Sequence, residues 1–188
     1  MEKKYELVKE DSIKEWGYNL YRIRALKDFN NVKKGDLGGY IAKEQNLSHD
    51  GDCWVHNNAK VFGNARVCDD AEVYNNARVC DNARVYGNAK VYGNARVFNN
   101  AKVYGNARVY SNADISNTTD YITIGPIGSR NDYTTFYLSK DKTIYAKCGC
   151  FNGSIDEFKD KVNETHKDND KYRNDYLSVI EVVKKVLL

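Results

Sequence analysis

A six-residue unit repeats without interruption from Cys53 to Ser116, and this repeat constrains the fold more than any other feature. A typical unit reads Ala-Arg-Val-Tyr-Gly-Asn. The large aliphatic position recurs every six residues from Val55 to Ile115, and a small residue stands two positions before it, from Cys53 to Ala113. A fixed short period of this kind is the signature of a solenoid.

The order of residue types inside one unit predicts its shape. Ala and Val alternate with Arg or Lys and with Tyr or Phe, which is the period-2 pattern of a short strand with one buried face. The last two positions are Gly, Asn, Asp or Ser followed by Asn or Asp, and these types tolerate the positive φ of a corner. Three units therefore close a triangular coil of about 18 residues, and stacked coils bury the Val column.

The unit Val-Tyr-Gly-Asn-Ala-Arg also resembles the hexapeptide motif of left-handed parallel β-helix proteins. Left-handedness is implied by this resemblance alone, since generic crossover sterics favour a right-handed connection. We therefore expect a mainly β protein: a left-handed parallel β-helix over residues 53–117, with an N-terminal β cap over residues 1–52 and a small C-terminal α+β domain over residues 118–188.

The two flanking segments carry their own signals. Residues 1–52 contain alternating stretches, and we expect them to cap the open N-terminal coil, whose strand edges would otherwise stay unpaired. In the C-terminal segment, TTDYITIGPIGSRNDYTTFYLSKDKTIYAKCGCF predicts a strand, a glycine turn and then a hairpin of YTTFYL and TIYAKC. Ser154 and Glu157 predict a capping box for a helix that runs to about His166. An apolar stripe predicts a second helix from Tyr172 to Leu187.

Composition excludes several classes of protein. The net charge of +3 is too small to indicate nucleic-acid binding. The sequence has no apolar run long enough for a membrane span and begins MEKKYELVKE, which is no signal peptide, so we expect a cytoplasmic protein without a membrane partner. The five cysteines are expected as free thiols. Cys148 and Cys150 lack two further ligands at a recognisable spacing, so no metal site is predicted.

Residues 18 apart should stack on the same outward face of the coils. Face one carries Trp54, Glu72, Lys90 and Arg108 beside His56, Tyr74, Tyr92 and Tyr110. Face two carries Lys60, Arg78, Arg96 and Asp114 beside Phe62, Cys80, Phe98 and Ser116. Face three carries Arg66, Arg84 and Lys102 beside Cys68, Tyr86 and Tyr104.

These basic and aromatic rows have three interpretations. They suit anionic ligands with flat rings, or they are strand-favouring ladders without a ligand. Exposed aromatic rows also indicate an interface, and we expect a homotrimer. Its predicted contacts are Tyr74, Tyr92, Tyr110, Tyr86, Tyr104, Phe62 and Phe98.

The segment GPIGSRNDYTT predicts a ligand site. Its backbone amides, hydroxyls and guanidinium suit a phosphate or another anion, and the candidate residues are Gly125, Gly128, Ser129, Arg130, Thr134 and Thr135. The segment lacks the GK[ST] ending of a P-loop, which argues against nucleotide hydrolysis. The alternative is a tight turn in which Arg130 pairs with a carboxylate.

Taken as a whole, the chain resembles YdcK-like hexapeptide-repeat proteins of bacteria and tailed phages, a group that carries a transferase label. The stretch YRIRALKDFNNVKKGDLGGYIAKEQNLSHDGDCWV and the NARVYG units carry this resemblance. TIGPIGSRNDYTTFY and CGCF resemble a module of phage-type proteins. Acyltransferases of this fold bind coenzyme A between neighbouring prisms and use a histidine base, often on an extruded loop. Coils 53–116 extrude no loop, which leaves His49 and His56 as candidate bases.

Three functions stay open. The first is a non-catalytic binding protein without a cofactor; the phage-type resemblance implies a counter-defence factor in the host cytoplasm that sequesters a small nucleotide signal or blocks a host defence protein. The second is an acyltransferase that uses coenzyme A, with His49 or His56 as general base. The third is a trimerising scaffold that presents three copies of the C-terminal domain.

Overall fold

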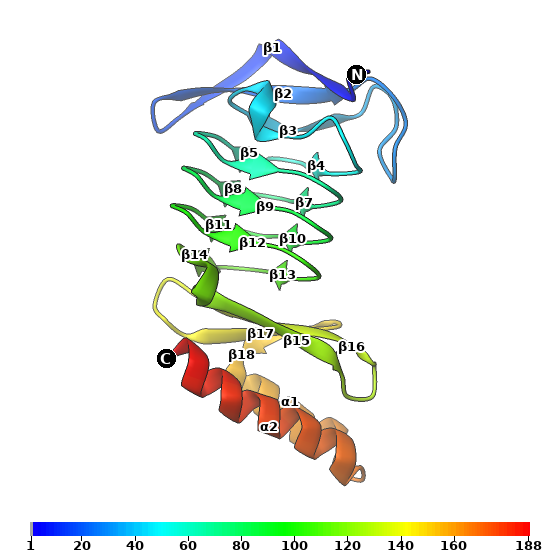
Figure 1. Cartoon of the computed structure of the whole chain (residues 1–188), viewed down its shortest axis with the longest axis vertical. Coiled ribbons are helices and arrows are strands. Elements are labelled where there is room, and N and C mark those ends of the chain that lie inside the picture. Colours follow the sequence, from blue (N-terminus) through cyan, green and yellow to red (C-terminus); the bar gives the residue numbers. More distant parts are fainter. Residues whose placement is uncertain (1) are drawn as a thin grey trace.

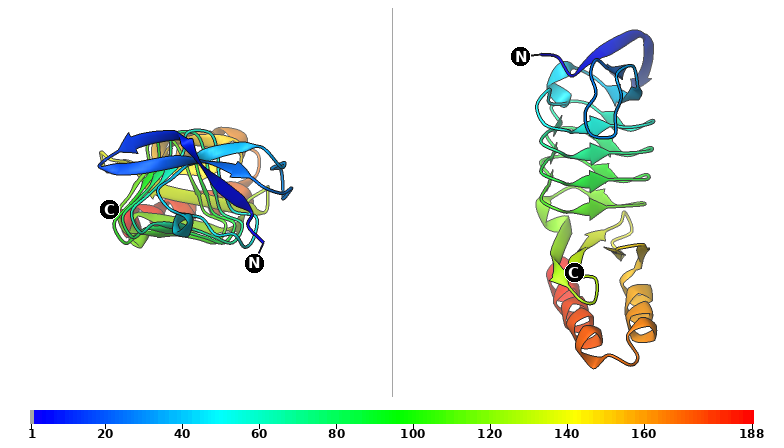
Figure 2. Two further views of the ribbon diagram at one scale, coloured as in Figure 1. Left: turned by 90° about the horizontal axis from the view of Figure 1, so that it is seen from above. Right: turned by 90° about the vertical axis from the view of Figure 1, so that its right-hand side faces the viewer.

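The computed structural model describes residues 2–188 and confirms a mainly β, parallel β-helical protein. Coils are stacked along the long axis of the molecule, between an N-terminal β cap and a C-terminal sheet with two helices (Figure 1). Seen along that axis, the coils superimpose into a three-sided outline (Figure 2). Among residues 2–188, no helix is long and apolar enough to cross a membrane. Left-handedness stays a prediction.

Each face of the prism is a parallel sheet of two-residue strands, one from each coil. Register confirms the predicted coil of 18 residues, because Lys60 pairs with Arg78 and Arg78 with Arg96. Face one contains β4 (Trp54–Val55), β7 (Glu72–Val73), β10 (Lys90–Val91) and β13 (Arg108–Val109). Face two contains β5 (Lys60–Val61), β8 (Arg78–Val79), β11 (Arg96–Val97) and β14 (Asp114–Ile115). Face three contains β6 (Arg66–Val67), β9 (Arg84–Val85) and β12 (Lys102–Val103).

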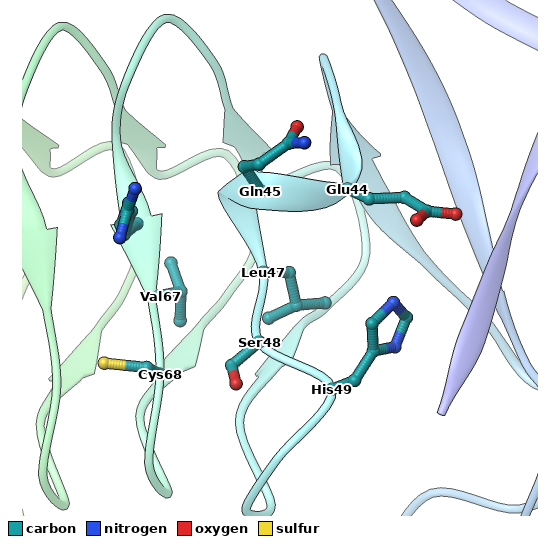
Figure 3. A pocket seen from close by; sticks show the side chains of 8 residues that line it. Glu44, Gln45, Leu47, Ser48, His49, Val67 and Cys68 are labelled. Atoms are coloured by element: carbon teal, nitrogen blue, oxygen red, sulfur yellow. The ribbon is translucent and has the colours of Figure 1, made fainter. Parts of the chain in front are cut away.

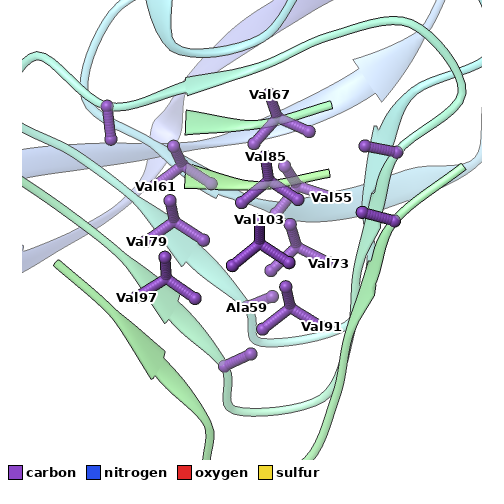
Figure 4. Close-up of a cluster of buried hydrophobic side chains, with 14 of the residues drawn as sticks. Val55, Ala59, Val61, Val67, Val73, Val79, Val85, Val91, Val97 and Val103 are labelled. Carbon is purple, nitrogen blue, oxygen red and sulfur yellow. The ribbon is translucent and has the colours of Figure 1, made fainter. Parts of the chain in front are cut away.

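The core of the prism is built from the large aliphatic and the small position of the repeat, which are mostly Val and Ala. The Val side chains from three faces meet in the centre of each coil and form columns along the axis (Figure 4). Val85 and Val91 have no exposed surface, and neither has Ala89 between them. Corner residues such as Asn57 and Asp69 adopt positive φ, as their types predict.

Coil geometry begins earlier than the repeat does. The cap strands β1 (Tyr5–Glu15), β2 (Tyr18–Ala25) and β3 (Leu37–Ile41) pair antiparallel, and β3 then pairs parallel with β5. Tyr40 pairs with Lys60, which sets Gly39 level with Ala59 in the small position. A Cβ on Gly39 would lie 2.4 Å from the Ala59 carbonyl oxygen, so only glycine fits. The short helix η1 (Glu44–Asn46) completes this first coil.

The β1–β2 hairpin also covers part of face two. At its tip, the Glu15 carboxylate accepts hydrogen bonds from Lys60 Nζ at 2.6 Å and from Arg78 Nε at 2.9 Å. Trp16 packs edge-on against Phe62, with ring centroids 5.8 Å apart, and Phe62 is consequently buried. Face two is thus partly covered by the chain itself.

The C-terminal domain is a four-stranded antiparallel sheet with helices on one side. The hairpin and both helices are confirmed, including the Ser154–Glu157 capping box. The fourth strand was not predicted. After η2 (Thr118–Asp120) the elements are β15 (Tyr121–Ile127), β16 (Asp132–Leu138), β17 (Ile144–Cys148), β18 (Phe151–Ser154), α1 (Ile155–Thr165) and α2 (Asp170–Leu187).

This domain closes the C-terminal end of the prism. Tyr137 is fully buried and belongs to the same core as the Val columns. Thr135 Oγ1 accepts a hydrogen bond from the Arg108 backbone N–H at 2.9 Å, which ties β16 to the last coil of face one. The helices pack on the other side, where Phe136, Phe158 and Ile180 share a separate core.

Candidate functional site

A cavity of about 350 Å³ lies in the C-terminal domain. This domain forms the end of the molecule away from the cap (Figure 1). The β15–β16 turn, the β17–β18 turn and both helices contribute to its wall. The lining side chains are Ser129, Arg130, Cys148, Cys150, Phe151, Phe158, Lys161, Val162, Thr165, His166 and Tyr176.

Tyr176 shapes the cavity from α2. Its ring packs edge-on against Phe158, and His166 stacks on it with centroids 5.7 Å apart. Gly128 allows this position, because a Cβ there would lie 2.2 Å from the Tyr176 ring and because its φ is +65°. Burial raises the pKa of the Tyr176 hydroxyl above its usual value, and the neighbouring Cys148 thiol adds to this effect. Tyr176 therefore contributes an aromatic ring and a neutral hydroxyl to the wall.

Arg130 supplies positive charge at the cavity. Its guanidinium lies over the β17–β18 turn, where a Cβ on Gly149 would be 2.7 Å from the Arg130 Nε atom. Arg130 forms no ion pair and no side-chain hydrogen bond among residues 2–188, so the alternative in which it pairs with a carboxylate is not observed. Its five N–H donors are free to meet an anion.

Other polar side chains adjoin the same cavity. Lys161 and His166 come from α1 and its C-terminal cap, and Ser129 precedes Arg130 in the turn. Lys161 already donates to Glu164 at 2.7 Å, an exposed contact that is worth little in water. The cavity thus combines an apolar floor with cationic and hydroxyl groups at its edge, which suits a small anion that carries a ring.

The structure does not bring all six predicted ligand residues together. Ser129 and Arg130 line the cavity, and Gly128 supports Tyr176. Gly125 instead lies close to the neighbouring strand β16, and Thr134 and Thr135 are buried within that strand. Thr135 is oriented toward the prism, and its hydroxyl oxygen also lies 3.2 Å from that of Thr123 on the neighbouring strand β15. Gly125, Thr134 and Thr135 are therefore removed from the proposed ligand contacts.

Sequence reasoning missed the helical side of this cavity. Lys161 and Thr165 are one turn apart on α1, next to the apolar stripe of Phe158 and Val162, and Tyr176 begins the stripe of α2. Such polar residues at the edge of a stripe were the available signal. Cys148 and Cys150 line the cavity as free thiols, and among residues 2–188 no cluster of three potential metal ligands is present.

His49, one candidate base, lies at the top of face three beside a hollow of about 450 Å³ (Figure 3). Its Nδ1 atom accepts a hydrogen bond from the Lys4 backbone N–H at 3.2 Å, and its ring stacks on Tyr5. Burial lowers the pKa of His49. With Nδ1 occupied and Nε2 buried, the imidazole is held by the cap rather than displayed to a substrate.

His56, the other candidate base, lies on face one. Its ring stacks on Tyr74 with centroids 4.2 Å apart, and its Nε2 atom is 3.8 Å from the Glu72 carboxylate, too far for a hydrogen bond. Burial lowers the pKa of His56 to about 4, with a smaller contribution from Lys90. The adjoining cavity measures about 310 Å³ and includes Asn30 from the loop between β2 and β3.

The structure places the predicted interface residues in environments of different exposure. Phe62 is buried under the β1–β2 hairpin, which removes it from the predicted interface. On face one, Tyr74 and Tyr92 stack, and the Tyr110 ring follows in the same column with its plane tilted by 35°. On face three, Tyr86 and Tyr104 stack, and Tyr104 is 46% exposed. Phe98 is half-buried beneath Arg96. The homotrimer stays a prediction, and a solution mass near 21.5 kDa by static light scattering would contradict it.

Comparison with known proteins identifies the repeat. Residues 77–91 and 89–103 match the YdcK beta solenoid repeat family. A 47-residue stretch is 45% identical to a protein of Escherichia coli K12 named uncharacterized acetyltransferase YdcK. That stretch is 24% of this chain and 14% of the relative's length. The family match therefore lies within the solenoid.

Proposed function

We propose that this chain is a binding protein and that its C-terminal cavity holds a small anionic ligand with a flat ring, such as a nucleotide. The observation that carries the proposal is Arg130, an arginine without a carboxylate partner among residues 2–188, beside an apolar cavity of about 350 Å³. An unpaired guanidinium at a concave apolar site matches a phosphate or carboxylate bidentately.

The remaining side chains divide the ligand into two parts. Phe151, Phe158 and Tyr176 offer apolar area to a ring, whereas Arg130 and Lys161 offer charge to a phosphate. Rings and guanidinium groups together are the usual means of holding nucleotides without base-specific readout. In the role implied by the phage-type resemblance, such a protein would sequester a small nucleotide signal of the host.

Acyl transfer is the second candidate, and it is suggested by the name of a relative that is matched over 14% of its length. Its histidines support it less well. His49 is engaged by the cap, and His56 is held against Tyr74 without a hydrogen bond to Glu72. A general base needs reach to the acceptor's proton, and neither imidazole is displayed on a loop.

Isothermal titration against 3′,5′-cyclic nucleotides, cyclic dinucleotides and ADP-ribose tests the proposal. We expect one of these classes to bind the wild-type chain, and we expect Arg130→Ala to weaken that binding by about 10- to 100-fold, the worth of a charge-assisted hydrogen bond. The melting temperature should stay the same, because Arg130 is exposed and has no partner among residues 2–188.

Lys185→Ala is the matched control, since Lys185 is an exposed cation of the same domain outside the cavity. It should leave affinity unchanged. A melting drop of several degrees in Arg130→Ala with unchanged affinity would assign Arg130 a structural role. Two results together would favour the acyltransferase. The wild-type chain would release free coenzyme A from acetyl-coenzyme A, an activity lost in His56→Gln or His49→Gln, and it would bind none of the nucleotides.

A further inference from the structure

The outward cations of the prism fall into two groups. On faces one and two, each Lys or Arg of the repeat lies close to a carboxylate. Glu15 pairs with Lys60 and Arg78 at 2.6 and 2.9 Å, and Asp114 lies 3.5 Å from Arg96. On face one, Glu72 lies 3.5 Å from Lys90, and Asp132 lies 3.6 Å from Arg108.

Face three has no such neutralisation. Arg66, Arg84 and Lys102 are all exposed, and none forms an ion pair or a side-chain hydrogen bond among residues 2–188. They stack in register, so the cations repeat about every 4.8 Å along the axis. Like charges on adjacent strands repel one another. This row costs stability unless an anion lies against it.

Acidic groups near face three are already engaged. The Glu44 carboxylate accepts from Lys3 Nζ at 2.6 Å. At the neighbouring corner, Asp69 accepts from the Gly87 backbone N–H at 2.9 Å, and Asp70 accepts from the Asp52 N–H at 3.2 Å. None of these carboxylates forms an ion pair with Arg66, Arg84 or Lys102 among residues 2–188.

Aromatic and concave features flank this row. Tyr86 and Tyr104 stand beside it, and a hollow lies at each end of the face. The upper hollow, of about 450 Å³, is lined by Arg66 and Cys68 among others, and Figure 3 shows its lining side chains, His49 and Glu44 included. The lower hollow, of about 370 Å³, is lined by Tyr104 and residues of the C-terminal domain.

The geometry of the tyrosines favours a protein over a single-stranded nucleic acid. Tyr86 and Tyr104 stack on each other with centroids 5.3 Å apart and planes 15° apart, so their facing sides are occupied. Bases bind such platforms by stacking on a free ring face. Tyrosine and arginine side chains close together are instead typical of protein–protein interfaces, where both residue types are enriched.

We propose that face three binds an acidic polypeptide segment of a protein partner. Its carboxylates would lie against Arg66, Arg84 and Lys102, and its intervening side chains would contact Tyr86 and Tyr104. In an extended segment alternate side chains are about 6.8 Å apart, a spacing that flexible Arg and Lys side chains can follow. This surface is separate from the C-terminal cavity.

Fluorescence anisotropy with a labelled decamer of glutamate tests this proposal at 50 mM and 300 mM salt. We expect binding at low salt, and we expect Arg66→Glu/Arg84→Glu/Lys102→Glu to weaken it at least tenfold. The control triple variant, Lys9→Glu/Lys159→Glu/Lys185→Glu, has the same net charge and changes exposed cations elsewhere. It should lower affinity less than threefold.

Circular dichroism of both variants checks that they fold. Equal losses in the two triple variants would show a net-charge effect and overturn the proposal. So would tighter binding of a 15-nucleotide oligothymidine than of the peptide. A fall in solution mass that is confined to the face-three variant would also overturn it, because the occupant would then be a second copy of this chain.

Discussion

The prism and the C-terminal domain both bury a hydrophobic core, but they build it from different residue types. The prism fills its interior with columns of Val and Ala that repeat every 18 residues, and each coil contacts the coils above and below it. The C-terminal domain fills its interior once, with Phe136, Phe158 and Ile180 between one sheet and two helices. Repetition gives the first region its stability and uniformity, whereas the second can build a singular cavity.

The largest expected effect separates the two cores. Ile180→Ala removes a fully buried side chain from α2 and should destabilise the C-terminal domain by about 2–5 kcal/mol. Hydrogen exchange should then show lost protection over residues 121–188 while the coils keep theirs. Equal loss of protection in the coils around Val79 would show that the two regions unfold as one unit.

A smaller effect is expected from the prism core. Val85→Ala removes two buried methyl groups and should cost about 2 kcal/mol, the transfer term plus a partly collapsed cavity. Urea denaturation followed by circular dichroism measures it. Arg84→Ala, one residue earlier but exposed, should change stability by less than about 0.5 kcal/mol. Similar losses of stability in both variants would contradict the conclusion that the buried Val85 side chain stabilises the prism core.

These two regions also differ in how far their residues predicted them. The β-helix, its coil length and its corners followed from the register of Val and Asn. In the first coil Gly39 takes the small position that Ala occupies in the repeat, and this concealed the true start of the coil geometry. In the C-terminal domain the hairpin and helices were predicted, but the predicted set of ligand-site residues was incomplete. Residues far apart in sequence, such as Arg130 and Tyr176, meet only through tertiary packing.

His56 on face one provides a pH test. Its pKa is lowered to about 4 in the folded chain from an ordinary value of 6.5, so the unfolded chain binds this proton first as pH falls. The contribution of neutral His56 to the free energy of unfolding is therefore fully present above pH 6.5, and it is lost as the pH falls from 6.5 to 4. The loss should be on the order of 1–3 kcal/mol.

The matched variant for this test is His56→Phe, which keeps a ring stacked on Tyr74 but cannot bind a proton. Because carboxylates elsewhere also titrate in this range, the measured quantity is the difference in unfolding free energy between the two proteins. That difference should change by about 1–3 kcal/mol from pH 7 to pH 4. A constant difference would mean that His56 is protonated as easily in the folded chain as in the unfolded one.

The smallest expected effect concerns the hairpin that makes face two unlike face three. Glu15 joins Lys60 and Arg78 across two coils, and their hydrogen bonds and charges lower the pKa of its carboxyl group. Glu15→Gln should cost about 1 kcal/mol, since it removes the charge from a partly covered network but keeps the shape of the side chain. Glu10→Gln on the same strand, exposed and without a side-chain partner among residues 2–188, should cost nothing measurable. Hydrogen exchange should show faster opening at the hairpin tip around Trp16 in the first variant only. If Glu15→Gln instead leaves the tip as protected as before, the aromatic packing of Trp16 on Phe62 is sufficient to hold the hairpin on face two, and the Glu15 ion pairs are not required for it.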